Sequence, residues 1–211
     1  MTSDKIYDAV QWLYGNCDHR LQNVFIYNWE SDFFCITKSH YSVEVEVKVS
    51  RSDFFADFKK PKHKLFENSR KTIYCRNDGT SKLGFQVKDP DSKYGWKWVY
   101  YESSNVTFIN PQEFTPNKFY FACPENMVKP EEVPAYAGLI YVPDRFMSVP
   151  CYEAKKAPFL HKFRKNFTGV LMSKYYHRVL NAKRQLSFLT FEHEKDEPIR
   201  KELEKIIKIL Q

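Results

Sequence analysis

VEVEVKV, residues 43–49, alternates valine with charged residues and gives the clearest indication of the fold. Glu44, Glu46 and Lys48 fall on one side of an extended chain, and the valines fall on the other. A period of two in β-branched residues is typical of a β-strand with one face in the core and one polar face. The sequence therefore predicts a strand that carries two acids and a lysine in line.

A second strand is predicted just before this one. FFCIT, residues 33–37, is followed by the polar residues 38–40, and the two features together indicate a β-hairpin. With a three-residue loop, Asp32 lies directly opposite Glu46 and on the same face. A loop one register later places Asp32 opposite Lys48 instead, and a two-residue loop places it on the other face.

Asp32 and Glu46 form the candidate metal site of this hairpin. Directly opposed residues have Cβ atoms about 5 Å apart, so the two carboxylates repel each other unless a cation lies between them. Hard oxygen ligands suit Mg²⁺ or Mn²⁺. Lys48 can orient a water molecule or neutralise the charge that grows on a phosphate. The pattern predicts metal-assisted phosphodiester hydrolysis, with Asp32, Glu46 and Lys48 as catalytic residues; the alternative is ordinary charge on a solvent-facing strand.

The rest of the chain predicts an α/β domain around a small mixed sheet. Patterns of apolar residues, caps and turns predict helices over residues 4–14, from Ser50 or Ser52 to Pro61, over 158–191 and over 196–210. They predict strands over 23–28, 117–124 and 137–144, and a β-hairpin excursion or long loop over about 68–112. We therefore expect a core over residues 1–160 and a basic helical extension over residues 161–211 packed on it.

Charge and cysteine content are those of a cytoplasmic protein and suit a nucleic-acid partner such as DNA, although many ordinary soluble proteins are equally basic. The 33 lysines and arginines exceed the 26 acids and give a net charge of +7, which suits a polyanion. The five cysteines form no CxxC pair, as expected of reduced core residues. No export signal is evident at the start, and no apolar run approaches the ~18 residues of a membrane span. No membrane partner is expected, and a homodimer is left open.

Basic residues are concentrated in KKPKHK, residues 59–64, and again between residues 155 and 184, where aromatic residues are interleaved. Such residues can neutralise phosphates and stack on bases. The candidate DNA contacts are Arg51, Lys59, Lys60, Lys62, Lys162, Arg164, Lys165 and Arg178. The alternatives are a solvated helix face for the basic run and, for Arg51, an ion pair with a first-turn acid, Asp53 or Asp57.

Two further residues are accessory candidates at the site. Glu44 shares the face of Glu46, and its alternative role is a contact with water or a basic residue. His161 lies in APFLHK, and its alternative role is that of a core or capping histidine.

EVEVKVSRSDFFADFKK (44–60) and PNKFYFACPENMVKPEEVPAYAGLIYV (116–142) resemble the MmcB-like DNA-repair family, a branch of the PD-(D/E)XK, or restriction-endonuclease-like, superfamily. The similar blocks cover about residues 25–67 and 116–163, under half of the chain. The resemblance implies a restriction-endonuclease-like core with a small mixed β-sheet flanked by helices; the β-hairpin insert and the helical C-terminal extension lie outside it.

The resemblance also assigns roles. Asp32 fills the first acidic position, Glu46 the second and Lys48 the lysine, while the Val47 carbonyl completes the metal shell; Ser31 stands where the motif often has proline. It implies a Mg²⁺- or Mn²⁺-dependent DNA endonuclease or DNA-processing protein in DNA repair or in phage or mobile-element DNA metabolism. The alternatives are a catalytically inactive DNA-binding repair-accessory module and a protein-interaction protein that uses the nuclease-like fold.

Overall fold

The computed structural model describes residues 1–69, 73–77, 82–102, 108–109, 111–144, 150–192 and 197–209. The chain divides into two compact units, Met1–Lys165 and Asn166–Gln211. The boundary thus follows Lys165, whereas the sequence placed it at residue 160. Among the described residues, no helix combines the length and the apolar character that crossing a membrane requires.

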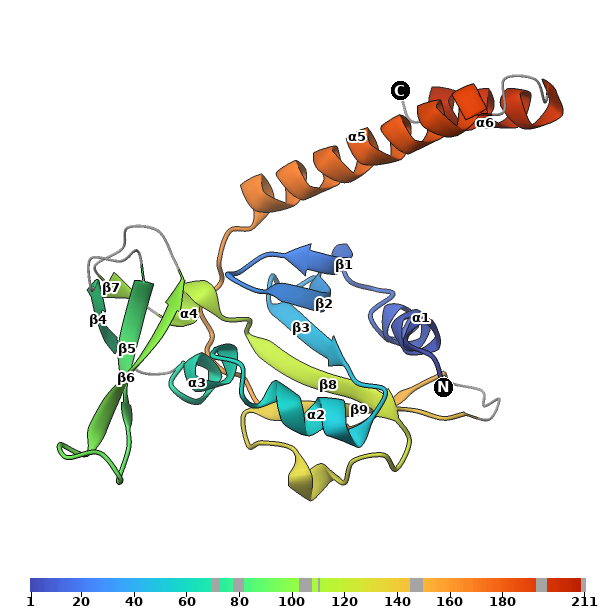
Figure 1. Cartoon of the computed structure of the whole chain (residues 1–211). Helices are drawn as coiled ribbons and strands as arrows, with labels where there is room; N and C mark the ends of the chain where they lie inside the picture. The colour runs from blue at the N-terminus through green and yellow to red at the C-terminus, as the bar shows by residue number, and fades with distance from the viewer. Residues whose placement is uncertain are drawn as a thin grey trace. The chain divides into compact units, whose positions relative to one another are not determined.

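A six-stranded mixed sheet forms the centre of the first unit, with the order β1-β2-β3-β8-β9-β10 (Figure 1). β1, β2 and β3 are antiparallel, β3, β8 and β9 are parallel, and β10 returns antiparallel to β9. The predicted α/β class is confirmed, and the sheet with its flanking helices is compatible with a restriction-endonuclease-like core. The strands are β1 (His19–Phe25), β2 (Glu30–Ile36), β3 (Ser42–Val47), β8 (Lys118–Pro124), β9 (Ala137–Val142) and β10 (Tyr152–Lys155).

The hairpin of β2 and β3 has the three-residue-loop register, the first of the three that the sequence allowed. The Thr37 amide donates to the Tyr41 carbonyl at 2.9 Å and closes the loop. His40 has a φ of 60°, the left-handed conformation that three-residue hairpin loops use. In this register Asp32 lies across from Glu46, one position beyond the last paired residues of the ladder.

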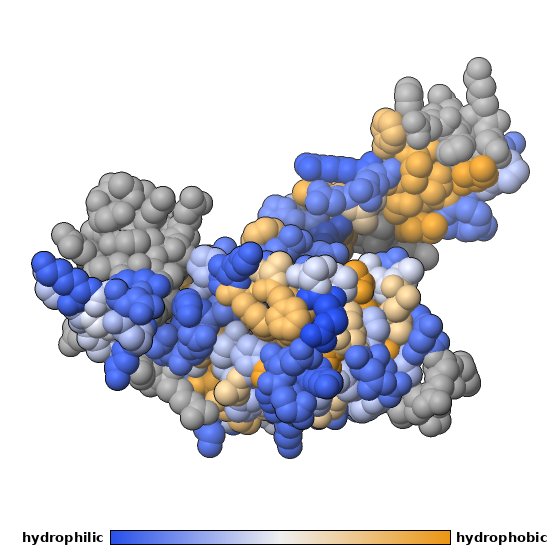
Figure 2. Space-filling view, turned by 60° about the horizontal axis from the view of Figure 1, so that its bottom comes forward, coloured by the Kyte–Doolittle hydropathy of each residue, from blue (hydrophilic) through white to orange (hydrophobic). Residues whose placement is uncertain are grey.

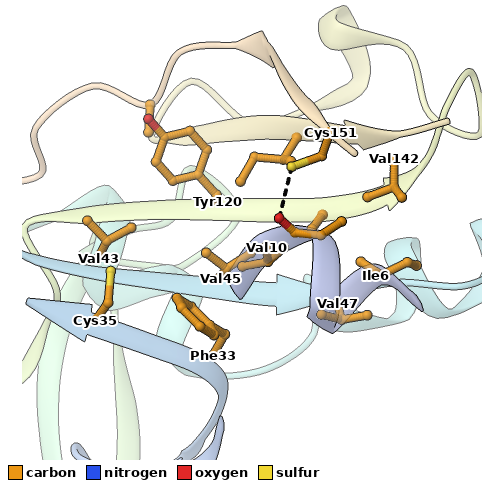
Figure 3. Close-up of a cluster of buried hydrophobic side chains, with 14 residues drawn as sticks. Ile6, Val10, Phe33, Cys35, Val43, Val45, Val47, Tyr120, Val142 and Cys151 are labelled. Atoms are coloured by element: carbon orange, nitrogen blue, oxygen red, sulfur yellow. Dashed lines mark hydrogen bonds between the residues drawn. The ribbon is translucent and has the colours of Figure 1, made fainter. Parts of the chain in front are cut away.

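Helices cover both faces of the sheet (Figure 1). α1 (Ser3–Leu13) packs Ile6 and Val10 against the valines of β3, as Figure 3 shows. α2 (Arg51–Asp57) and α3 (Lys62–Glu67) pack aromatic residues against Phe119 and Phe121 on the other face of β8. α2 begins where predicted, because the Ser50 hydroxyl accepts a hydrogen bond from the Asp53 amide at 3.2 Å. The charged residues of β3 therefore face α2 and α3.

The insert in the middle of the chain forms a second sheet. β4 (Ile73–Asn77), β5 (Lys82–Lys88), β6 (Trp96–Glu102) and β7 (Phe108–Ile109) are antiparallel, with the order β6-β5-β4-β7. The sequence predicted a β-hairpin excursion or a long loop here, and β5 with β6 is such a hairpin. Two short helices follow, α4 (Pro111–Phe114) and the 3₁₀ helix η1 (Pro130–Glu132).

Several elements depart from the sequence prediction. β1 begins at His19 rather than at residue 23, and α3 and β10 were not predicted. The helix expected from residue 158 begins only at Thr168. Residues 156–165 form an irregular strap within the first unit instead, where the Leu160 amide donates to the Asn117 carbonyl at 2.8 Å.

The second unit consists of α5 (Thr168–Glu192) and α6 (Glu197–Ile209), which contact each other. Apolar side chains gather on the surface of these helices (Figure 2). Those of Met172, Tyr176 and Phe188 are each more than 60% exposed. Both predicted C-terminal helices are therefore present, and α5 keeps a large part of its apolar surface exposed.

Candidate active site at the ends of β2 and β3

β2 and β3 bring Asp32, Glu46 and Lys48 together on the face opposite α1. The Asp32 carboxylate accepts a hydrogen bond from the Val47 amide at 2.8 Å. The Lys48 ammonium donates to the Glu46 carboxylate at 3.1 Å. The hairpin register thus juxtaposes the three residues to which the sequence assigned catalysis.

The polar face of β3 is buried. Glu44 is 0% exposed, and Glu46 and Lys48 are each 3% exposed. The alternative of surface charge on a solvent-facing strand is therefore wrong, because β3 lies between β2 and β8 and its polar face is covered by α2 and α3. Buried charges are costly unless they are paired, so the partners of these residues define the site.

Glu46 lies at the centre of a buried ionic cluster. Its Oε1 atom is 3.1 Å from the Lys48 ammonium and 2.8 Å from that of Lys60, and its Oε2 atom is 2.6 Å from that of Lys62. Burial alone would raise the pKa of Glu46, but these ammonium groups outweigh burial and hold the pKa below its usual range. Glu46 is therefore ionised at neutral pH. We call Asp32, Glu44, Glu46, Lys48, Asp57, Lys60 and Lys62 the carboxylate–lysine cluster.

A chain of buried polar groups, which begins at Asp57, holds the Lys48 ammonium in place. Its ammonium lies 3.0 Å from Asp57, whose other oxygen lies 2.7 Å from Nε2 of His63. Nδ1 of His63 lies 2.8 Å from the Tyr136 hydroxyl. Burial would raise the pKa of Asp57, but the His63 hydrogen bond and the nearby lysines hold it well below its usual range. Asp57 is the last residue of α2, so it is not the first-turn acid that the sequence suggested. Its carboxylate forms an ion pair with Lys48 instead.

Glu44 is fully buried beside Glu46. The Trp29 indole donates to both Glu44 oxygens, at 2.9 and 3.1 Å, and the Lys62 ammonium lies at 3.4 Å. Burial raises the pKa of Glu44 to about 7, although Lys62 and Trp29 act to lower it. Glu44 thus has the contact with a basic residue that was its alternative role, and its accessory role stays a prediction.

Asp32 is the carboxylate of the cluster with the least compensation. Burial and, after it, the neighbouring Glu46 charge together raise its pKa to about 6, although the Val47 hydrogen bond and the charges of Lys48 and Lys62 act to lower it. Among the described parts of the chain, no lysine, arginine or histidine nitrogen forms an ion pair with Asp32. The four carboxylates of the cluster face three ammonium groups, and Lys48 also lies 3.7 Å from the half-exposed Asp53. The carboxylate that lacks an ammonium partner within the described residues is the one across from Glu46.

These pKa shifts predict how stability varies with pH. The pKa of Glu44 is about 7 instead of 4.5, and that of Asp32 is about 6 instead of 3.8. The contribution of these two groups to the free energy of unfolding is therefore complete at low pH and is lost as the pH rises through 6 and 7. Glu46 and Asp57 have lowered pKa values, so the stability that they contribute is present at neutral pH and is lost as the pH falls. We expect the free energy of unfolding to rise by about 1–2 kcal/mol from pH 8 to pH 6 and to fall below about pH 4.

Urea denaturation in buffers that contain EDTA measures this profile. Glu44→Gln is the matched variant, because it keeps the volume of the side chain and removes its titration. Most of the rise between pH 8 and pH 6 should disappear in that variant. A wild-type stability that falls steadily from pH 8 to pH 6 would contradict the assignment.

The donor set suits a hard divalent cation. Asp32, Glu46 and the Val47 carbonyl supply oxygen atoms, which Mg²⁺ and Mn²⁺ prefer. The uncompensated charge of Asp32 fits such an ion. Within the described residues, no group of three or more histidine, cysteine, aspartate or glutamate side chains is placed to hold a metal ion. The ion would thus rest on two carboxylates and backbone oxygen, and Glu46 would have to release an ammonium group to bind it.

The basic residues next to the site divide into two groups. Lys62 was predicted to contact DNA, but it is 3% exposed and its ammonium is bound to Glu46, so this assignment is corrected. Arg51 pairs with Glu132 at 2.6 and 3.0 Å rather than with either predicted acid of α2. Lys59 is exposed, and the side chain of Lys60 is 51% exposed although its ammonium pairs with Glu46 and Asp57. A DNA contact by either lysine stays a prediction.

The other predicted DNA contacts lie elsewhere. Lys162, Arg164 and Lys165 belong to the strap, and Arg164 stacks on Tyr41 at 4.8 Å, before the start of β3. Lys48 follows the end of β3, so the structure does not bring these three residues to the cluster. Arg178 lies in α5 of the second unit.

His161 is a core histidine. It is 6% exposed, its Nε2 atom lies 3.0 Å from the Thr115 carbonyl, and its Nδ1 atom lies 3.2 Å from the Asn117 amide nitrogen. Burial lowers its pKa below the usual range. Asn117 also accepts from the Ser42 amide at 2.8 Å and donates to the Phe163 carbonyl at 2.8 Å. His161 therefore helps to fix the strap at the end of the sheet away from Lys48.

Comparison with known proteins yields one structural likeness. No family model matches the chain, and no curated protein matches it. A solved protein of unknown function from Silicibacter pomeroyi has a TM-score of 0.49 and 15% sequence identity; the match covers 87% of this chain and 92% of that one.

Proposed function

We propose that this protein hydrolyses phosphodiester bonds in DNA with the help of Mg²⁺ or Mn²⁺, as a nuclease similar to the MmcB-like DNA-repair family. One observation carries the proposal. The hairpin register sets Asp32 across from Glu46, and Lys48 follows on the same face of a mixed sheet. DNA repair or phage or mobile-element DNA metabolism, in the cytoplasm, is the corresponding setting.

The residues of the chain divide the work. Asp32, Glu46 and the Val47 carbonyl would hold the cation, which supplies Lewis-acid polarisation of a phosphoryl oxygen when bound. Lys48 would stabilise the negative charge that develops on the phosphate, because a fixed ammonium in a water-poor site acts strongly on such charge. Asp57 holds Lys48 in place at 3.0 Å. The exposed Lys59 and Lys60 would contact the DNA backbone.

A second candidate function is a DNA-binding repair-accessory module that does not cleave. The observation that favours it is the saturation of Glu46, whose two oxygens are bonded by three ammonium groups. In such a protein the lysines would replace the metal ion as a permanent counter-charge.

Cleavage of single-stranded, duplex and flapped DNA in Mg²⁺ or Mn²⁺ tests the proposal. Wild-type protein should cut at least one substrate, and Asp32→Ala and Lys48→Ala should each lower the rate by about 10²–10³-fold or more, because each removes charge that acts in the transition state. Lys64→Ala, on the exposed side of α3, is the control for loss of a surface lysine. Equal cutting by all the proteins would reveal a contaminating nuclease and refute the proposal, and DNA binding without cutting would support the second candidate.

A further inference from the structure

Lys60 differs from the other lysines of the carboxylate–lysine cluster. The side chain of Lys60 is 51% exposed, whereas those of Lys48 and Lys62 are 4% and 2% exposed. Lys60 lies in the turn between α2 and α3, where its amide donates to the Asp57 carbonyl at 2.9 Å. Its ammonium reaches inward to Glu46 at 2.8 Å and also pairs with Asp57. Lys60 can therefore withdraw its ammonium without opening the core.

The cluster stays paired when Lys60 leaves. Glu46 keeps Lys48 on Oε1 and Lys62 on Oε2, and Asp57 keeps Lys48 and His63. What changes is the balance of charge, since four carboxylates then face two ammonium groups. Departure of Lys60 thus lowers the positive charge at Glu46 and restores part of the capacity of this carboxylate to bind a cation.

We propose that Lys60 is an exchangeable counter-ion. Its ammonium neutralises Glu46 and Asp57 until a divalent cation binds at Asp32 and Glu46, and it then pairs with a phosphate of the nucleic acid. This inference rests on the proposed function, and it adds a mechanism that links the occupancy of the metal site to the presence of substrate. A buried lysine such as Lys62 cannot make this exchange, because its ammonium is enclosed between Glu46 and the ring of Phe119.

The charge of Lys60 is maintained throughout the exchange. Burial lowers its pKa, but the hydrogen bonds to Asp57 and Glu46 outweigh burial and raise the pKa above its ordinary value. Once the ammonium leaves these carboxylates, the side chain still carries its charge at neutral pH, because the ordinary pKa of an exposed lysine is about 10, and it can therefore bind phosphate. The exchange predicts that metal and DNA each increase the affinity for the other, and by thermodynamic linkage the two effects must be equal.

The first measurement is the dissociation constant for Mn²⁺ without DNA, by isothermal titration calorimetry. Lys60→Met keeps the length of the side chain and removes the competing charge, so Mn²⁺ should bind about tenfold more tightly than to wild type. Lys64→Met is the matched control: it removes a lysine of α3 that pairs with Glu67 at 3.4 Å, and it should leave the affinity unchanged. Asp32→Ala should lose the binding. Lys60→Gln replaces the methionine variant if that variant does not fold.

The second measurement is the coupling between metal and DNA. Mn²⁺ affinity is determined with and without a saturating, nuclease-resistant phosphorothioate duplex. The duplex should tighten Mn²⁺ binding by wild type several-fold, Lys60→Arg should retain the effect, and Lys60→Met should lose it.

The outcomes separate the inference from the proposed function. Equal Mn²⁺ affinity in wild type and Lys60→Met, with loss in Asp32→Ala, would overturn the exchange and leave the metal site standing. Absence of Mn²⁺ binding in both wild type and Lys60→Met would overturn the exchange together with the metal-dependent function.

Discussion

Replacing Gly138 with alanine is expected to destabilise the protein by about 3 kcal/mol or more. Gly138 lies in β9 and pairs with Tyr120 of β8. A Cβ atom at this position would lie 2.5 Å from Cδ1 of the Tyr120 ring and 2.6 Å from the backbone nitrogen of Ala157. Real Cβ atoms do not approach their neighbours so closely, so the ring or the strap would have to shift.

Neither neighbour of Gly138 can move easily. Tyr120 is 2% exposed, and its hydroxyl donates to Glu153 at 2.5 Å. Ala157 is buried in the same core cluster. Overpacking of this kind displaces backbone as well as side chains, and β8 is the strand that pairs with β3 and positions Glu46. The loss of stability should therefore be accompanied by a loss of any activity that depends on the cluster.

Urea denaturation of Gly138→Ala and of a matched glycine variant measures the effect. Gly169→Ala is the control, because Gly169 lies in α5 and its added Cβ would meet nothing within 4 Å. Alanine favours a helix over glycine by up to about 1 kcal/mol, so the control should be neutral or slightly stabilising. A Gly138→Ala protein within about 0.5 kcal/mol of wild type would show that β9 and the strap are not packed as described.

Lys62→Met is expected to cost about 3 kcal/mol at pH 8, the second-largest effect. Lys62 is buried with its ammonium 2.6 Å from Glu46 and 3.4 Å from Glu44. Methionine fills a similar volume but leaves these carboxylates with less counter-charge. Breaking a buried ion pair from one side is strongly destabilising, because the remaining charge stays desolvated.

The cost of Lys62→Met should depend on pH. With Lys62 present, the pKa of Glu44 is already raised to about 7, so Glu44 takes up a proton readily when its counter-charge is removed. We expect a smaller loss of unfolding free energy at pH 6 than at pH 8. Glu44→Gln in the Lys62→Met background should recover part of the loss, as a double-mutant cycle would measure. The same loss at both pH values, without recovery, would mean that Lys62 acts through packing alone.

The hairpin shows how far the sequence determined the site. The period of two in β3 and a three-residue loop allow the register that places Asp32 across from Glu46, and both signals are local. The burial of the acidic face was not predicted, because alternation of valine with charge is also the pattern of a half-exposed strand. Only the position of β3 between β2 and β8 decides between the two.

The partners of the acids could not be read from the sequence. KKPKHK looks like a solvated basic run, yet Lys62 and His63 are buried in α3, a short helix that begins after Pro61. A proline before a short amphipathic segment is a weak signal of such a helix. Tyr136 and Glu132 are distant in sequence from His63 and Arg51, which they contact, so only the tertiary fold brings them together.

The parallel pairing of β3 with β8 has a consequence for how the connection between these strands can change in evolution. Val47 and Lys118 end and begin neighbouring strands, and the whole second sheet is contained in the connection between them. The entropy lost in closing such a connection grows only with the logarithm of its length. Evolution can therefore lengthen, shorten or replace that connection at little thermodynamic expense, so new recognition surfaces can arise there while the carboxylates on β2 and β3 stay where they are.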